Sequence, residues 1–110
     1  MNGVPTISVD QIPAELPAGV TLLDVREPVE WAHGRAPGAL HVPMNDVPDR
    51  VEELPEGQLL VICKVGGRSA QVAGYLVQRG LDAVNVDGGM LEWQAAGRPM
   101  ESDAGVPVVF

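Results

Sequence analysis

The sequence predicts an α/β domain in which helices cover both faces of a mainly parallel, five-stranded sheet. One observation is that short apolar runs alternate with helical patterns along the whole chain. A second is that the connections between these segments are only a few residues long. A third is the length of 110 residues, which fits a single domain. We expect a core over about residues 7–99 and a C-terminal tail over 100–110.

Five segments have the pattern of strands. Residues 20–25 are the clearest, because they combine β-branched and apolar side chains, and residues 59–62 form a continuous apolar run. Turn residues such as Pro17, Gly19 and Gly57 precede these two segments. The expected strands are residues 7–9, 20–25, 40–43, 59–62 and 83–87.

The segments between the expected strands favour helices. The strongest pattern covers residues 69–78, where small and apolar side chains suit one packed face and Gly80 supplies a stop. Pro28 suits the first turn of a short helix, Asn45 can cap another, and Pro13 limits the first helix to a brief one. The expected helices are residues 11–16, 27–32, 45–53 and 69–78, with a last helix that follows Gly88 and Gly89 and runs through Ala96.

The charge and the metal-ligating residue types exclude several function classes. Fifteen acidic residues against seven basic ones give a net charge of −8, so we expect no nucleic-acid partner. One cysteine excludes an internal disulfide, and His33 and His41 lack the spacing of metal ligands, so we expect neither a metal nor a cofactor. No apolar stretch reaches the ~20 residues of a membrane span. The N-terminus also lacks a signal-peptide pattern, so we expect a cytoplasmic protein without a membrane partner.

The single cysteine, Cys63, is the strongest functional candidate. It follows the apolar run 59–62 and opens a glycine-rich loop that leads directly into a helical pattern. A helix N-terminus, free backbone N–H groups and the cations Lys64 and Arg68 all favour the thiolate, so we expect an exposed, reactive thiol. A lone cysteine in another context would be read as a small buried hydrophobe. The two nearby cations on an acidic protein suggest a small anionic substrate.

These features together resemble the rhodanese family of sulfurtransferases over about residues 7–99. The most specific element is residues 63–69, which read Cys-Lys-Val-Gly-Gly-Arg-Ser and are similar to the family's active-site loop. Upstream, residues 23–26 followed by Glu30 and by residues 34–39 resemble the family's first signature. Downstream, residues 87–93 resemble its closing element, with a glycine pair and a tryptophan. The sequence departs from the family pattern at Arg35, where a histidine is usual.

The resemblance implies a sulfurtransferase in which Cys63 is the catalytic nucleophile. Its thiolate would take the outer sulfur of a donor such as thiosulfate, and the resulting persulfide would pass that sulfur to cyanide, a biological thiol or a protein acceptor. The binding residues would be those of the loop: Lys64, Val65, Gly66, Gly67, Arg68 and Ser69.

The chemistry suggests a separate part for each kind of loop residue. Gly66 and Gly67 would let backbone N–H groups point inward as an anion-binding nest. Lys64 and Arg68 would bind the oxygens of the leaving sulfite, with Arg68 carrying more of the effect. Ser69 would either donate its hydroxyl to the sulfur or simply cap the helix.

Other notable residues are predicted to be structural. We expect Asp24, Arg26 and Glu30 to form a polar network that fixes the strand end near the loop. Trp93 is expected to anchor the core, whereas Trp31 could border the pocket.

Three alternatives remain open. Phosphatases and arsenate reductases with a cysteine–arginine loop have five residues between Cys and Arg, whereas four separate Cys63 from Arg68 and make a tighter cup. Those of the tyrosine type also carry a histidine where Ile62 stands here. A non-catalytic interaction module with this fold is a second alternative, although such domains typically lose the cysteine. A peroxide sensor based on a lone reactive thiol is the third.

Overall fold

A computed structural model of the protein describes residues 3–110 and confirms the predicted α/β class. Five strands pair in parallel to form one sheet with the order β1-β5-β4-β2-β3. The first strand therefore lies beside the last one, which fills the space between β1 and β4. The strands are β1 Thr6–Ser8, β2 Val20–Asp24, β3 Leu40–His41, β4 Gln58–Ile62 and β5 Asp82–Asp87.

Helical segments connect the strands, and α3 is the longest of them. The α-helices are α1 Pro28–His33, α2 Val47–Arg50, α3 Gly67–Gln78 and α4 Gly89–Ala95. Short 3-10 helices occur at η1 Val9–Gln11, η2 Met44–Asp46 and η3 Val51–Glu53. Within residues 3–110, no helix has both the length and the apolar character needed to cross a bilayer.

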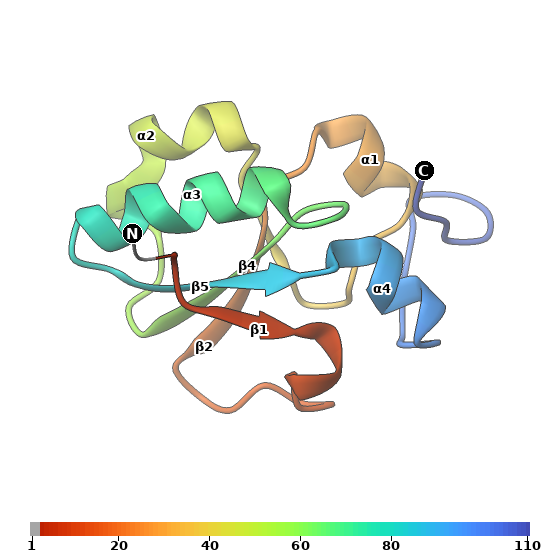
Figure 1. Ribbon diagram of the computed structural model, residues 1–110. Coiled ribbons are helices and arrows are strands. Elements are labelled where there is room, and N and C mark those ends of the chain that lie inside the picture. The colour runs from red at the N-terminus through yellow and green to blue at the C-terminus, as the bar shows by residue number, and fades with distance from the viewer. Residues whose placement is uncertain (1–2) are drawn as a thin grey trace.

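Each face of the sheet has its own hydrophobic core, because successive strand residues point to opposite faces. Leu22 and Leu60 belong to one cluster together with Trp93 of α4, and Leu23 and Val61 belong to the other. The second cluster includes Val72, Ala73 and Leu76 of α3. Figure 1 shows α2 and α3 on one side of the sheet and α4 near the end toward which β5 points. Cys63 belongs to the cluster on the α3 side.

Two of the expected helices are wrong in detail. Residues 11–16 do not form a helix, because Pro13 forces the preceding Ile12 into an extended conformation, with φ −84° and ψ 125°. The expected helix over residues 45–53 is divided into η2, α2 and η3. Asp46 rather than Asn45 precedes its α-helical part, and Arg50 leaves helical geometry with φ −121° and ψ 14°.

The C-terminal tail packs back on the domain. Arg35 and Glu101 form an antiparallel bridge, and the Val108 N–H donates to the carbonyl of His33 at 2.9 Å. Val109 is only 7% exposed and belongs to the core cluster that contains Trp93. In Figure 1 the tail accordingly runs beside α1 and α4.

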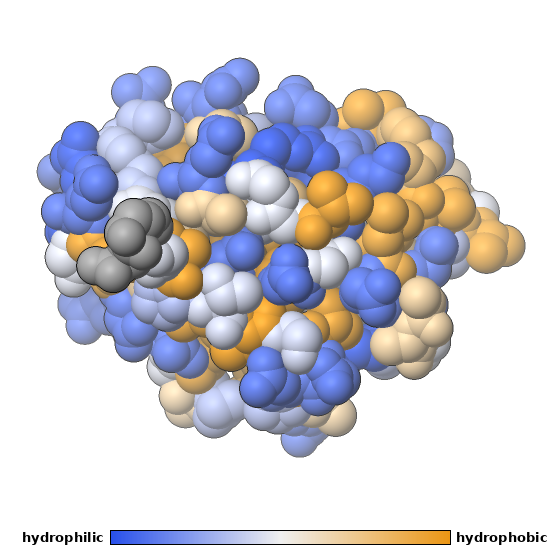
Figure 2. Space-filling model, in the orientation of Figure 1, coloured by the Kyte–Doolittle hydropathy of each residue, from blue (hydrophilic) through white to orange (hydrophobic). Residues whose placement is uncertain are grey.

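Exposed hydrophobic side chains gather on one side of the molecule. Figure 2 shows a mostly hydrophilic left half and a group of hydrophobic residues on the right, where the tail and the cysteine loop lie. The large exposed hydrophobic residues include Val65 of the loop, Leu91 of α4, and Val106, Val108 and Phe110 of the tail.

Candidate active site

The site is built where β4 ends and α3 begins. The carboxyl ends of parallel strands meet at one edge of the sheet, where ligands bind in open α/β folds. Cys63 directly follows β4, and three loop residues separate it from the first residue of α3, Gly67. A hydrogen bond from the Val25 N–H to the carbonyl of Ile62, 3.0 Å long, ties the end of β4 to the end of β2. The sheet thus fixes the position of the thiol.

The loop surrounds the Cys63 sulfur with hydrogen-bond donors. The backbone N–H groups of Gly66 and Ser69 donate to Sγ at 3.1 and 3.3 Å, and the Ser69 hydroxyl lies 3.2 Å from it. Gly66 adopts φ +122°, a conformation that side-chain-bearing residues rarely adopt. The expected nest is present, with Gly66 rather than Gly67 supplying a donor to the sulfur.

The pKa of the Cys63 thiol lies below its usual value. Burial is the largest single influence and raises the pKa, because it disfavours a charge. The hydrogen bonds from the Ser69 hydroxyl and from the backbone of Ser69, Gly66 and Val65 together outweigh it. The predicted thiolate character therefore comes from these hydrogen bonds, and neither Lys64 nor Arg68 is among the main causes.

The expectation of an exposed thiol is wrong. Cys63 is 1% exposed, because the loop folds its backbone N–H groups around the sulfur and α3 packs above it. The site favours small reacting groups for this reason.

Asn85 is a polar residue of the site that the sequence reasoning missed. It lies on β5, is 5% exposed, and its Oδ1 accepts a hydrogen bond of 2.6 Å from the Ser69 hydroxyl. A hydroxyl has one proton, so once Cys63 is a thiolate Ser69 must donate to the sulfur. The Asn85 amide then offers its NH₂ group to the Ser69 oxygen, since an amide can both accept and donate. The available signal was an asparagine between the apolar residues Val84 and Val86 of the strand.

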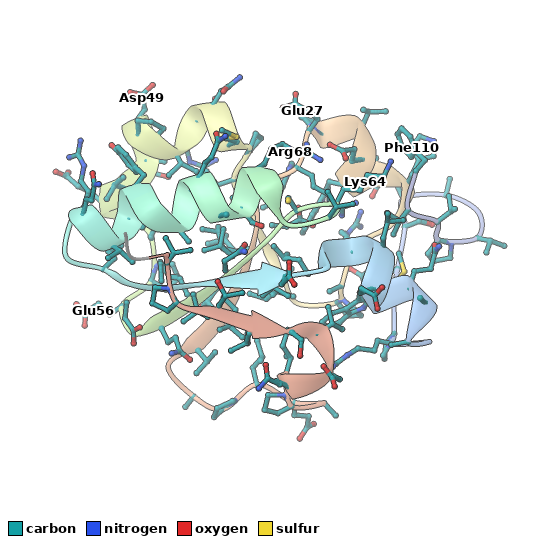
Figure 3. The ribbon with its side chains drawn as sticks, in the orientation of Figure 1. Glu27, Asp49, Glu56, Lys64, Arg68 and Phe110 are labelled. Atoms are coloured by element: carbon teal, nitrogen blue, oxygen red, sulfur yellow. The ribbon has the colours of Figure 1, made fainter. Side chains whose placement is uncertain are left out.

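The two cations of the loop have different surroundings. Arg68 binds Glu30 of α1 in a bidentate manner, with Nη1–Oε1 2.8 Å and Nη2–Oε2 3.0 Å. This contact holds the pKa of Glu30 below its usual value and raises the pKa of Arg68. No hydrogen bond or ion pair joins the Lys64 ammonium to any residue within 3–110. Figure 3 shows Lys64 and Arg68 at the same end of the molecule as Glu27, near the start of α3.

The expected network of Asp24, Arg26 and Glu30 therefore needs a correction. Asp24 and Arg26 do form a buried ion pair, with Nη2–Oδ2 2.7 Å, and the same nitrogen donates to the carbonyl of Gly34 at 2.7 Å. Glu30 instead pairs with Arg68. The reason is geometric: α1 carries Glu30 toward the loop, while the buried guanidinium of Arg26 points to Asp24 and to the end of α1. Trp93 anchors the core as expected, and its Nε1–H donates to the carbonyl of Pro99 at 2.8 Å.

The start of α4 holds the backbone of the cysteine loop. The N–H groups of Met90 and Leu91 donate to the carbonyls of Cys63 and Lys64 at 2.8 and 3.0 Å. A Cβ atom on Gly89 would lie 2.5 Å from both of those carbonyl oxygens, and Gly89 has φ +57°. Gly89 is therefore needed for close approach between two segments that are distant in sequence.

The family of the chain follows from comparison with known sequences. The family described as Rhodanese-like domain matches residues 8–96. The chain belongs to this family. The rhodanese domain is also 41% identical over 88 residues to a protein from Allochromatium vinosum named "Sulfurtransferase", covering 78% of this chain and 82% of that protein.

Solved structures of similar chains agree with this fold. The crystal structure of SSP1007 from Staphylococcus saprophyticus is 43% identical with a TM-score of 0.73, over 81% of this chain and 92% of that one. A rhodanese-like domain protein from Staphylococcus aureus is 36% identical with a TM-score of 0.73, over 81% and 90% of the two chains. The family and these relatives support a rhodanese-type sulfurtransferase in general terms.

The rhodanese loop has the groups for nucleophilic sulfur chemistry. Among residues 3–110 no group of three or more His, Cys, Asp or Glu side chains is placed to hold a metal ion. The loop holds a thiol with a lowered pKa and backbone donors that converge on its sulfur. These groups can stabilise negative charge on Cys63 or on one further atom bound to it.

Proposed function

We propose that this protein is a sulfurtransferase that carries a sulfane sulfur as a persulfide on Cys63. The observation that carries the proposal is the set of donors that converge on Sγ, from Gly66, Ser69 and the Ser69 hydroxyl. A persulfide is an anion at neutral pH and needs the same kind of stabilisation as a thiolate. The buried position of Cys63 also shields such an intermediate from bulk solvent.

The proposed reaction has two steps. With thiosulfate as donor, the Cys63 thiolate attacks the outer sulfur, a new S–S bond forms, and the donor S–S bond breaks. Sulfite leaves with the electron pair, and the persulfide keeps one negative charge. In the second step cyanide or a thiolate attacks the outer sulfur of the persulfide, which returns Cys63 to the thiolate. No proton, metal or redox cofactor is needed for the balance.

Each loop residue has a role in this proposal. Gly66 and Ser69 stabilise the thiolate and the persulfide, while Val65 and Gly67 shape the backbone around them. Lys64 and Arg68 supply positive charge for the oxygens of a small anionic donor. The acceptor is a small thiophile or a thiol on a protein, and the reaction suits the reducing cytoplasm, where a lone thiol stays reduced.

Intact-mass spectrometry tests the proposal directly. After incubation with thiosulfate, the protein should gain the mass of one sulfur atom, and cyanide should remove that mass as thiocyanate. The variant Cys63→Ser should show neither change. A Cys63→Ser protein that still releases thiocyanate at the wild-type rate would overturn the proposal, and failure of the wild-type chain to gain sulfur from any donor would favour a non-catalytic module.

Aryl-phosphate hydrolysis tests the main enzymatic alternative. Only four residues separate Cys63 from Arg68, so we expect a cup with room for one additional sulfur but not for a phosphate group. The purified protein should not hydrolyse an aryl phosphate above the Cys63→Ser background. Hydrolysis that depends on Cys63 and exceeds thiosulfate turnover would replace sulfur transfer with phosphoryl transfer.

A further inference from the structure

The ion pair between Arg68 and Glu30 changes the electrostatics of the proposed donor site. Both oxygens of Glu30 are occupied by the guanidinium, and the Glu30 side chain is only 12% exposed. The Arg68 side chain is 34% exposed. A planar bidentate pair of this kind is among the strongest hydrogen-bonded arrangements of side chains. Most of the Arg68 charge is therefore neutralised before a donor arrives.

Further carboxylates lie close to the loop. Glu27 acts on Arg68 through its charge, and Asp87 Oδ1 lies 3.3 Å from the position of a Cβ on Gly66. Against Glu27, Glu30, Asp87 and the Cys63 thiolate, the loop has only Lys64 and the paired Arg68. The whole chain also carries a net charge of −8. The mouth of the site is thus poorly suited to holding a dianion beside the thiolate.

We propose that Glu30 determines the donor class of this site, by pairing with Arg68 so that a hydropersulfide, R–S–SH or R–S–S⁻, is favoured over dianionic thiosulfate. This inference rests on the proposed persulfide function of Cys63. It makes Glu30 a specificity-determining residue that acts through Arg68 and does not itself touch the donor.

The charges of the two reactions explain the preference. Thiosulfate brings two negative charges to the thiolate, and sulfite carries both away after the S–S bond breaks. A hydropersulfide brings at most one negative charge. Its terminal sulfur joins Cys63, the R–S bond to that sulfur breaks, and R–S⁻ leaves with the electron pair or as R–SH when the donor proton is retained. The second reaction therefore brings less negative charge together in a site whose positive charge is limited.

The test uses Glu30→Gln in the full-length chain. Glutamine keeps one oxygen that can accept from Arg68 Nη1 and from the Glu27 N–H, which donates to Glu30 Oε1 at 2.9 Å. Its NH₂ group cannot accept from Arg68 Nη2, so the variant loses the charge and one of the two hydrogen bonds to Arg68 but keeps the other. Glu27→Gln is the matched control, because it removes an exposed carboxylate that influences Arg68 by charge. For each protein kcat/KM is measured with thiosulfate and with cysteine hydropersulfide, at low and at high potassium chloride.

In the wild-type protein we expect a higher kcat/KM with cysteine hydropersulfide than with thiosulfate, and a thiosulfate value that rises with salt because screening reduces repulsion. Glu30→Gln should raise kcat/KM for thiosulfate about fivefold, as expected for the loss of one unit of charge at short range in partly solvated surroundings. It should also make that kcat/KM depend less on salt. The hydropersulfide value should change less than about twofold, and Glu27→Gln should have a smaller effect than Glu30→Gln on thiosulfate.

Two results would overturn the inference. One is a fall in thiosulfate turnover in Glu30→Gln, which would mean that the pair positions Arg68 for oxygen binding. The other is an equal change with both donors, which would indicate a general structural effect. Failure of the underlying function looks different, because the wild-type protein would then form no Cys63 persulfide with either donor in the mass spectrum.

Discussion

The reactivity of Cys63 depends on a few neighbouring atoms that belong to three different segments. Its own loop contributes N–H groups, α3 contributes the Ser69 hydroxyl, and β5 contributes Asn85 behind it. The glycine-rich loop and Ser69 could be predicted because they are adjacent in sequence. Asn85 and the pairing of Glu30 with Arg68 could not, since each joins residues that only the completed fold brings together.

The Ser69 hydroxyl should influence the ionisation of Cys63 directly. We expect Ser69→Ala to raise the pKa of Cys63, because the thiolate loses a donor while burial continues to disfavour its charge. The rate of sulfur transfer at neutral pH should fall about tenfold, as expected for a lost hydrogen bond to a charged group. Thiolate ultraviolet absorbance against pH measures the midpoint, and Ser102→Ala in the C-terminal tail is the control. An unchanged midpoint would contradict the assignment.

The same ionisation links stability to pH. The pKa of Cys63 is lower in the folded protein than in the unfolded chain, so the folded state is favoured whenever the thiol is ionised. This contribution is fully present above the unfolded value of about 8.5 and is lost as the pH falls through the lower folded value. The rate of sulfur transfer should also decline as the pH falls through the folded-state pKa of Cys63, because the thiolate is the attacking form.

The two loop cations should differ in their effect on thiosulfate turnover. Arg68→Ala should lower it more than Lys64→Ala, because it leaves the half-buried carboxylate of Glu30 unpaired beside the loop. Arg68→Lys should restore activity only in part, since an ammonium cannot form the bidentate contact. The double variant Arg68→Ala/Glu30→Gln should recover part of the loss. Equal and slight losses in both single variants would instead place the two side chains in solvent.

The elements of the fold were predictable to the extent that each has its own pattern in the sequence. The buried runs of β2, β4 and β5 and the packed face of α3 were found within one or two residues. The division of the expected helix over residues 45–53 into three parts was missed, because the local sequence pattern does not record how neighbouring segments pack. The contact between α4 and the cysteine loop was missed for a different reason: a glycine pair indicates a turn but not the backbone that it approaches.

Gly89 should matter more than an ordinary glycine in a turn. Gly89→Ala combines a positive φ with a clash against the carbonyls of Cys63 and Lys64, and we expect it to destabilise the fold by about 2–4 kcal/mol. Gly80→Ala is the control, because Gly80 has φ +87° with no atom within 4 Å of its Cβ position, and it should cost about 1 kcal/mol. Urea unfolding measures both. Equal losses would show that the close approach carries no cost of its own.

At the scale of the whole molecule, the tail is part of the core. Val109→Ala should lower the free energy of unfolding by about 1–2 kcal/mol, because a buried side chain beside the Trp93 cluster is shortened. Val106 of the same tail is 86% exposed, and Val106→Ala should change stability by less than about 0.5 kcal/mol. Urea denaturation of the two variants makes the comparison. Similar small effects would show that the tail is not held against the domain in solution.

The position of β5 between β1 and β4 also has a consequence for the order of events during synthesis. A ribosome releases Cys63 and its glycine loop well before β5, Asn85 and the start of α4, all of which complete the surroundings of the sulfur. β1 cannot pair in the sheet before β5 has been synthesised, because β5 is its partner. The nascent chain therefore carries an ordinary thiol, and the reactive thiol is completed only after β5 and the start of α4 have been synthesised.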